Sequence, residues 1–180
     1  MNRCCSQSGQ GLVETAIVAT VLITMVVGVW DAAGLSAAEN QATTATRNGA
    51  RLAASLGNDL ANPVTGPFSP VDIDEKVVNT VVATMQGVPN SVVTKVDIYE
   101  PAAPPQSGEE PGLNHIDSYQ PDGTPIGNPG YTLDLRSQTP GAESYIGVME
   151  FYTYNAPAPL LPFFSGPKTN FTVMQLVPVG

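Results

Sequence analysis

The first strong feature of the chain is a long apolar run near its amino terminus. No side chain between Glu14 and Asp31 is charged, and the residues there are mainly Val, Ile, Leu, Ala, Thr and Met. At about 1.5 Å per residue, a helix of this run and its apolar flanks approaches the roughly 30 Å thickness of a bilayer core. Trp30 stands where an interfacial aromatic ring would lie. The pattern therefore predicts a transmembrane helix over residues 10–33.

The flanks of the run predict its orientation. Arg3 and the free amino terminus precede it, whereas an acidic segment follows. The positive-inside preference then places the amino terminus in the cytoplasm and the bulk of the chain outside. Residues 34–180 are expected to form one extracytoplasmic domain, which is long enough to bury a modest core.

The helical pattern continues beyond the apolar run to about Leu56, where Gly57 and Asn58 give a stop signal. Small side chains let another backbone approach closely. A stripe made mostly of small residues therefore predicts packing, either on the chain's own domain or on identical neighbours. Arg47 and Arg51 lie off this stripe and are interpreted as part of a solvated face rather than a functional basic spot. The stripe recurs at spacings of three and four and consists of Leu35, Ala38, Ala42, Ala45, Gly49, Leu52 and Leu56.

A second helix is predicted to start near Asp72 and to end before Gly87. Asp72 is expected to cap it, with Glu75 three residues later. Capping is preferred to calcium binding for this acidic segment, because the glycine and terminal glutamate of a calcium loop are missing. The apolar face of the helix is expected to consist of Ile73, Val77, Val78, Val81, Val82 and Met85.

Four strands are predicted after this helix. Residues 91–99 alternate in the manner of a strand with one buried face, and further strands are expected from Tyr131, Ser144 and Asn170. They follow one another without intervening helices, which favours an antiparallel sheet. The predicted fold class is α+β: a long amino-terminal helix, a second helix and a sheet of about four strands, covered by the helix stripe.

Two segments have no clear periodicity. Residues 100–130 are rich in proline, glycine and acidic residues, so an exposed, mobile loop is expected there. Such a loop either carries specificity for a partner or is a tolerated surface insertion. Residues 151–164 concentrate aromatic residues and prolines, which favours packing into a turn over a docking patch.

Charge and chemistry narrow the possible functions. The net charge of -9 opposes binding to phosphate backbones, so no nucleic-acid partner is expected. Cys4 and Cys5 are adjacent and cannot cross-link distant parts of a fold; acylation of this pair has little support. His115 is the only histidine and has no cysteine nearby, so no metal site and no cofactor are predicted. Phosphate-binding loops and nucleophile motifs are also missing, which favours a structural role over an enzyme.

The amino-terminal segment "SGQGLVETAIVATVLI" resembles the start of a type IV pilin-like protein. A short polar leader ends in Gly9, a glutamate follows five residues later, and an apolar run comes next. The later "RNGARLAA" resembles the segment after the anchor in TadE/TadG-like proteins of the tight adherence (Flp-type, type IV) pilus. The layout around "VTKVDIYEP" and the carboxyl-terminal aromatic region is similar in composition.

This resemblance implies a minor pilin or pseudopilin, a single-pass protein of the bacterial cytoplasmic membrane that can enter a pilus. A prepilin peptidase would remove residues 1–9 by cutting between Gly9 and Gln10. Glu14 would then meet the new amino-terminal ammonium of a neighbouring subunit and set the assembly register. Prepilin peptidase, other pilin or assembly subunits and membrane lipid are the implied partners. An unpaired carboxylate in hydrocarbon costs several kcal/mol, which gives this pairing its physical reason.

Several alternatives stay open at this point. An ordinary secretory signal could be cut near "GLSAAE", residues 34–39, and leave a secreted protein. The chain could be an anchored extracytoplasmic binding domain that never polymerises. An anchored hydrolase using His115 is the third alternative. Glu14 could also be a carboxylate at the headgroup level with no partner.

Overall fold

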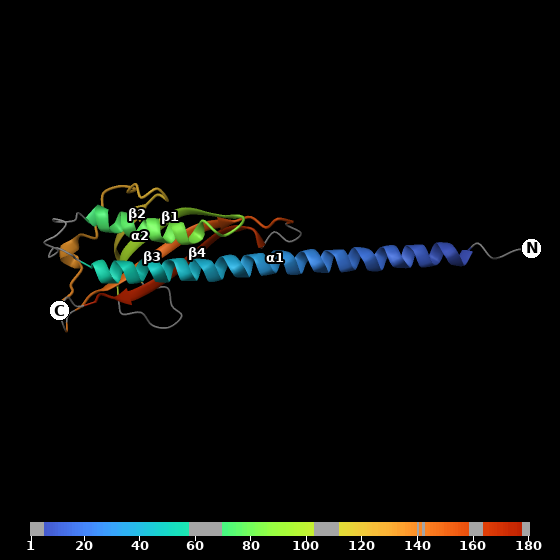
Figure 1. The fold of residues 1–180 in the computed structure, drawn as a ribbon, viewed down its shortest axis with the longest axis horizontal. Helices are drawn as coiled ribbons and strands as arrows, with labels where there is room; N and C mark the ends of the chain where they lie inside the picture. The colour runs from blue at the N-terminus through green and yellow to red at the C-terminus, as the bar shows by residue number, and fades with distance from the viewer. Residues whose placement is uncertain are drawn as a thin grey trace, which may run out of the picture.

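A computed structural model of the chain shows a long helical rod with an α+β domain packed along its carboxyl-terminal half (Figure 1). The structure describes residues 6–57, 70–102, 112–139, 141, 143–158 and 164–177. Cys4 and Cys5 lie outside these residues. The elements follow the order α1, α2, β1, β2, a short 3-10 helix η1, β3 and β4.

Helix α1, Ser6–Leu56, has 51 residues and is therefore about 75 Å long. It ends where the sequence predicts. Gly57 adopts a positive φ of 48°, and its N–H donates to the carbonyl of Ala53 at 2.9 Å. A glycine in this left-handed conformation closes the last turn of a helix without a steric penalty. The stop signal at Gly57 is confirmed.

Helix α2, Pro70–Met85, begins two residues before the predicted start. The prediction of Asp72 as the cap is wrong, because Asp72 lies in the first turn of the helix. Proline at the first helical position explains the earlier start, since its fixed φ suits a helix and it has no N–H that would need a partner there. The apolar face is confirmed: Val82 is half-buried, and Ile73, Val77, Val78, Val81 and Met85 are buried.

The sheet has four antiparallel strands in the order β2-β1-β3-β4. Consecutive pairing of β3 with β4 is local, whereas β1 lies between β2 and β3. Helix α1 packs against β3 and β4, and α2 packs against α1 and β1, so the helices cover one face of the sheet (Figure 1). The predicted α+β architecture is confirmed. The bounds are β1 Ser91–Pro101, β2 Leu113–Tyr119, β3 Tyr145–Tyr154 and β4 Gly166–Gln175.

Two predictions within residues 100–135 are wrong. β2 lies inside the segment expected to be a mobile loop, and it pairs with β1 from Val96–Tyr119 to Pro101–Leu113. The strand expected from Tyr131 is instead the 3-10 helix η1, Leu133–Leu135. Tyr131 and Leu133, which belong to the segment expected to form a strand, are buried. Burial of these two side chains therefore comes from a tight turn rather than from a sheet ladder.

The core lies between the two helices and the inner face of the sheet. Alanines of α1, valines of α2 and residues of β1 and β3 such as Ile98 and Val148 form one buried cluster. Tyr152 and Tyr154 are buried in the same cluster. The interpretation of the aromatic segment as packed is confirmed for these two residues.

The outer face of the sheet is also partly closed. Tyr99 is buried and lies over Gly147, its cross-strand partner. A Cβ at Gly147 would collide with the Tyr99 ring, so only glycine allows this contact. The second half of β1 is therefore buried on both faces, whereas the sequence predicted one buried face.

Candidate functional site

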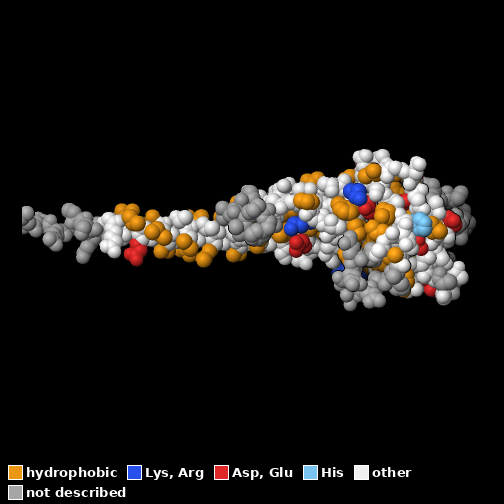
Figure 2. Space-filling view, turned by 180° about the vertical axis from the view of Figure 1, so that it is seen from behind, with side chains coloured by type: hydrophobic (Ala, Val, Ile, Leu, Met, Phe, Trp, Pro, Cys, Tyr) orange, Lys and Arg blue, Asp and Glu red, His pale blue; other side chains and the backbone are white. Residues whose placement is uncertain are grey.

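The amino-terminal half of α1, from Gly9 to Trp30, is an apolar rod that the domain does not cover. Figure 2 shows hydrophobic side chains along its length, whereas most basic and acidic side chains gather on the domain. Within the described part of the chain, this is the one helix long and apolar enough to cross a membrane. The domain buries no part of its most apolar 18-residue segment. Its large exposed side chains are Leu12, Val13, Ile17, Val18, Val21, Leu22, Ile23, Met25, Val26, Val29 and Trp30.

The threonine hydroxyls of the rod form hydrogen bonds within the helix. The hydroxyls of Thr15, Thr20 and Thr24 donate to the carbonyls four residues earlier, at 2.8, 2.8 and 2.9 Å. Such bonds leave no hydroxyl in need of water, which suits an apolar environment. The rod therefore presents almost no unsatisfied polar group along its uncharged length.

Glu14 is the exception on the rod. It is exposed one turn after Gln10, on the same stretch of helix as Gly9 and Ile17. Among the residues that the structure describes, no cation lies within ion-pair distance of Glu14. Gly9 and Gln10, the predicted processing residues, are exposed and belong to the first turns of the helix. The carboxylate thus has room for a partner from outside the described chain.

The domain begins to cover α1 at Asp31. This residue follows the exposed Trp30, yet its own side chain is buried. Its Oδ1 accepts the N–H of Ala158 at 3.3 Å, while its Oδ2 is buried without a hydrogen-bond partner among the described residues. Tyr154 lies next to Gly34, one turn further on, so closely that a Cβ at Gly34 would collide with its hydroxyl.

The stripe of small residues faces the chain's own domain. Ala38, Ala42 and Ala45 are fully buried, and Gly49 is buried against Val81 of α2, whose Cγ2 would stand 2.6 Å from an added Cβ. Leu35, Leu52 and Leu56 are half-buried at the margin. Of the two packing roles that the sequence left open for this stripe, contact with the chain's own domain is the one present in the structure.

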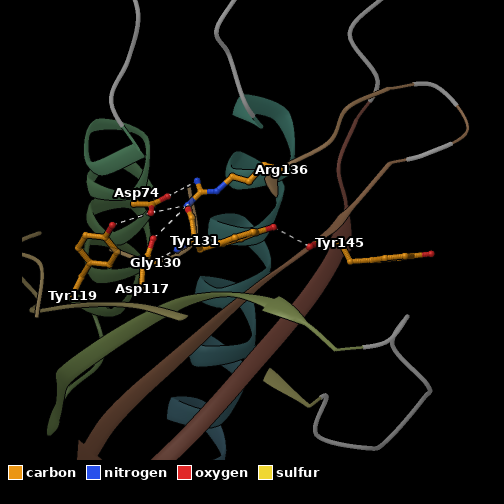
Figure 3. A network of polar contacts seen from close by, with 7 residues as sticks. All are labelled: Asp74, Asp117, Tyr119, Gly130, Tyr131, Arg136 and Tyr145. Carbon is orange, nitrogen blue, oxygen red and sulfur yellow. Dashed lines mark hydrogen bonds and ion pairs between the residues drawn. The ribbon is translucent and has the colours of Figure 1, made fainter. Parts of the chain in front are cut away.

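A buried ion pair ties α2 to the segment before β3 (Figure 3). Arg136 donates to both carboxylate oxygens of Asp74, at 2.7 and 2.9 Å, and both side chains are fully buried. The hydroxyl of Tyr119 donates to Asp74 at 2.8 Å. The carbonyl of Tyr131 accepts from Arg136 at 3.0 Å, and the guanidinium lies 4.5 Å from the centre of the Tyr131 ring.

Asp117 of β2 completes this network. Its Oδ1 accepts the N–H groups of Gly130 and, at 3.0 Å, Tyr131, and its Oδ2 lies 3.8 Å from Arg136. Burial raises the pKa of Asp74, and the hydrogen bonds and charge of Arg136 oppose that rise. Burial lowers the pKa of Arg136, but its bonds to Asp74 outweigh this and raise it overall. The network is sealed from solvent, so it positions β2 and η1 rather than binding a substrate.

Glu150 is a second buried acid on the inner face of the sheet. Neither carboxylate oxygen has a hydrogen-bond partner among the described residues. Its cross-strand partner is Asn170, which bonds to Thr43 and Thr46 of α1. Burial raises the pKa of Glu150 to about 8, so the side chain holds its proton at neutral pH.

His115 has a surface role. Its Nδ1 lies 2.7 Å from Glu100 on the neighbouring strand, and both residues are at least partly exposed. No group of three or more metal-ligating side chains occurs among the described residues.

The sequence did not predict that Asp74, Arg136 and Asp117 form one buried network. A single arginine within the apolar "YTLDLRS" was the available signal for a buried partner.

Comparison with known families concerns the rod and the first part of the packed half of α1. Residues 9–51 match the family described as TadE, TadE-like protein. Over this segment the chain is similar to TadE-like proteins. The match starts at Gly9 and ends within the buried stripe, so the TadE-like segment includes both the exposed rod and the contact with the domain. No curated protein and no solved structure matches the chain.

Proposed function

We propose that this TadE-like chain is a membrane-anchored minor pilin or pseudopilin that takes part in assembling a tight adherence pilus or a related secretion system. The first half of α1 spans the cytoplasmic membrane, with the amino terminus in the cytoplasm and residues 34–180 outside. The observation that carries this proposal is the rod itself: a continuous apolar helix that the domain leaves bare, within a TadE-like segment.

Processing by a prepilin peptidase between Gly9 and Gln10 belongs to the same proposal. Both residues are exposed on the helix, and removal of residues 1–9 creates an ammonium group at Gln10, one turn before Glu14. Cleavage also removes Cys4 and Cys5. Between neighbouring subunits, this ammonium and Glu14 neutralise each other, which sets the assembly register and lowers the cost of holding a carboxylate in hydrocarbon.

Because the stripe packs against the domain, the proposal assigns the subunit contacts to the rod. Side chains of Ala38, Ala42 and Ala45 are covered already, so neighbouring subunits would meet through exposed residues such as Val18 and Val21. Assembly by this route needs no reaction after processing.

The test compares Glu14→Gln with Glu39→Gln in cells that assemble the pilus. Both glutamates are exposed on α1, one on the rod and one beside the domain. Glu14→Gln should keep membrane insertion and cleavage but lose incorporation, measured by mass of the amino-terminal peptide and by immunoblot of sheared pili. Glu39→Gln should incorporate normally. Normal incorporation of Glu14→Gln would remove the register mechanism.

Cross-linking separates a pilin from a binding domain that never polymerises. Val21→Cys would be the one cysteine of the processed chain, since residues 1–9 carry both native cysteines. A pilin should give intersubunit disulfides at Val21→Cys and none at Ala42→Cys, whose position is buried. An amino terminus at residue 1 or near residue 39 would instead support an unprocessed anchor or an ordinary secretory signal.

A further inference from the structure

An apolar groove of about 900 Å³ lies where the rod meets the domain. One wall is α1 from Met25 to Ala37, including Trp30. The other wall is formed by Val88 and Pro89 in the turn after α2 and by Tyr154 and Pro157 at the end of β3. Of the described residues that line it, none is charged. The groove is thus a continuation of the rod's apolar surface onto the base of the domain.

The level of the groove along α1 decides what it faces. Met25 lies five residues before Trp30, which is about 7 Å deeper along the helix axis towards the amino terminus. If residues 10–30 cross the bilayer, Trp30 lies at the outer interface and Met25 lies within the hydrocarbon. The domain wall of the groove faces α1 between Met25 and Ala37, so it lies at or near this interface.

We propose that the base of the domain docks on the outer leaflet and that phospholipid acyl chains fill this groove. The inference rests on the proposed anchoring and adds to it a second membrane contact, made by Val88, Pro89 and Pro157 of the domain. The domain then does not stand clear of the membrane on its helix.

The shape of the rod's surface favours lipid over a second helix as the occupant. Exposed large side chains occur at consecutive positions, such as Val21, Leu22 and Ile23, and so face all sides of the helix. A helix that is apolar all round is typical of a lipid environment, whereas one partner helix needs a single apolar stripe. Met25 and Trp30 belong both to the groove and to this exposed surface of the rod. Whatever surrounds the rod therefore also reaches the groove.

The burial of Asp31 agrees with a base in contact with lipid. This carboxylate lies directly after Trp30, at the level of the groove, and the domain covers it completely. The N–H of Ala158 bonds to it, and the hydroxyl of Tyr154 lies against Gly34, one turn further along α1. A carboxylate exposed at the hydrocarbon boundary would be costly, so its cover removes an obstacle to immersion.

The experiment uses the full chain in phosphatidylcholine vesicles that contain lipids brominated near the headgroup or near the chain ends. Trp30 is the one tryptophan and serves as the built-in probe. In a Trp30→Phe background, Pro89→Trp and Pro157→Trp each place a probe on the domain wall of the groove. Both positions are exposed, so the new rings do not enter the core.

Ile126→Trp in the same background is the matched control. Ile126 is exposed and its N–H bonds to Ser118 at the end of β2, beside Tyr119. Tyr119 bonds to Asp74 near the start of α2, whereas the groove lies after the end of α2. The control is therefore separated from the groove by most of the length of that helix, about 20 Å.

The expected result is quenching at positions 89 and 157 by lipid brominated near the headgroup, of a size comparable with that of Trp30, and no quenching at position 126. Quenching of Trp30 alone would overturn the docking of the domain and leave the anchor intact. Lack of quenching at Trp30 itself would overturn the proposed anchoring as well.

A second measurement identifies a competing occupant. A blue-shifted but unquenched probe at position 89, together with a cross-link from Pro89→Cys to another subunit, would show that a second copy fills the groove and would overturn the lipid proposal. Circular dichroism of each variant establishes that the domain is folded. If Pro89→Trp fails to fold, Pro157→Trp carries the same test from the other segment.

Discussion

The two halves of α1 carry opposite kinds of side chain for opposite surroundings. From Gly9 to Trp30 the large branched residues are exposed on all sides, and Trp30 is 71% exposed. From Asp31 to Leu56 the residues on the inner face are small, and Ala38, Ala42 and Ala45 are fully buried. Large apolar residues suit a helix that is surrounded by lipid, whereas small ones suit a helix that must approach a sheet closely.

The rod and the domain also differ in where they place charged side chains. The rod carries one carboxylate, Glu14, and it is exposed. The domain carries exposed charges too, but it also buries Asp74, Arg136 and Glu150 completely. An apolar surface and a charged interior are each unfavourable in isolation. The rod leaves its apolar surface and its carboxylate exposed, whereas the domain encloses its buried acids, Asp74 in an ion pair and Glu150 with its proton retained.

Breaking the buried ion pair should have the largest effect. Arg136→Met leaves the Asp74 carboxyl buried without its bidentate partner, which should cost about 3–5 kcal/mol of domain stability. Arg51→Met, at an exposed position of α1, should change stability little. Urea unfolding followed by circular dichroism, with the protein in detergent, measures both. A loss below about 1 kcal/mol for Arg136→Met would contradict the role given to the pair.

Glu150 should make the stability of the domain depend on pH. The pKa of Glu150 is raised from 4.5 to about 8 in the fold by burial, so the folded state holds a proton that the unfolded chain releases. The contribution of Glu150 to stability should therefore be largest below about pH 4.5, fall by a few kcal/mol as pH rises to about 8, and then level off.

Glu150→Gln should flatten this pH dependence and raise stability at high pH, whereas Glu14→Gln should leave the profile of the domain unchanged. Unfolding midpoints measured at several pH values test the pair. A Glu150→Gln protein with the same slope as the original chain would show that another group is responsible.

Enlarging an alanine should matter in one half of α1 only. Ala45→Leu places a larger side chain into the interface with the domain, which should cost about 1–3 kcal/mol by overpacking. Ala19→Leu makes the same change on the exposed rod and should leave domain stability within about 0.5 kcal/mol of the original. Thermal unfolding of the two variants in the same detergent gives the difference. Equal losses would contradict the division of α1 into two surroundings.

The surface pair should have the smallest effect. His115→Gln removes the contact with Glu100, which is partly exposed and screened by solvent. A change below about 1 kcal/mol is expected, in contrast to the loss for the buried pair of Arg136. Denaturant titration at neutral pH measures it. A loss as large as that of Arg136→Met would mean that the edge strand β2 depends on this contact.

The elements predicted correctly from sequence are those with strong local signals. Periodic residues along α1, the glycine at 57 and the valine face of α2 each reflect contacts within a few turns of helix. The strand β2 was missed because its first half is exposed and lacks alternation, so its pairing with β1 is what makes it a strand. The strand expected from Tyr131 is a 3-10 turn instead. Either structure can bury apolar residues such as Tyr131 and Leu133, so their presence in the sequence does not distinguish the two.

The candidate site divides in the same way. The exposed rod, Glu14 and the stripe follow from residues close together in sequence, and a pattern of that kind can be read without coordinates. The cover over Asp31 comes from Ala158, 127 residues later, and the groove combines α1 with two distant turns. No local sequence pattern predicts contacts between residues so far apart in the chain.

The sequence by itself determined that the chain has a long helix with a bare apolar end and a small-residue inner face, because helical periodicity is a property of neighbouring residues. Only the tertiary structure decided that Arg136 pairs with Asp74 across 62 positions, that Glu150 loses its contact with water, and that the domain reaches back to Trp30. The physical reason is that burial and ion pairing depend on which distant segments meet, and that choice is made by the whole fold.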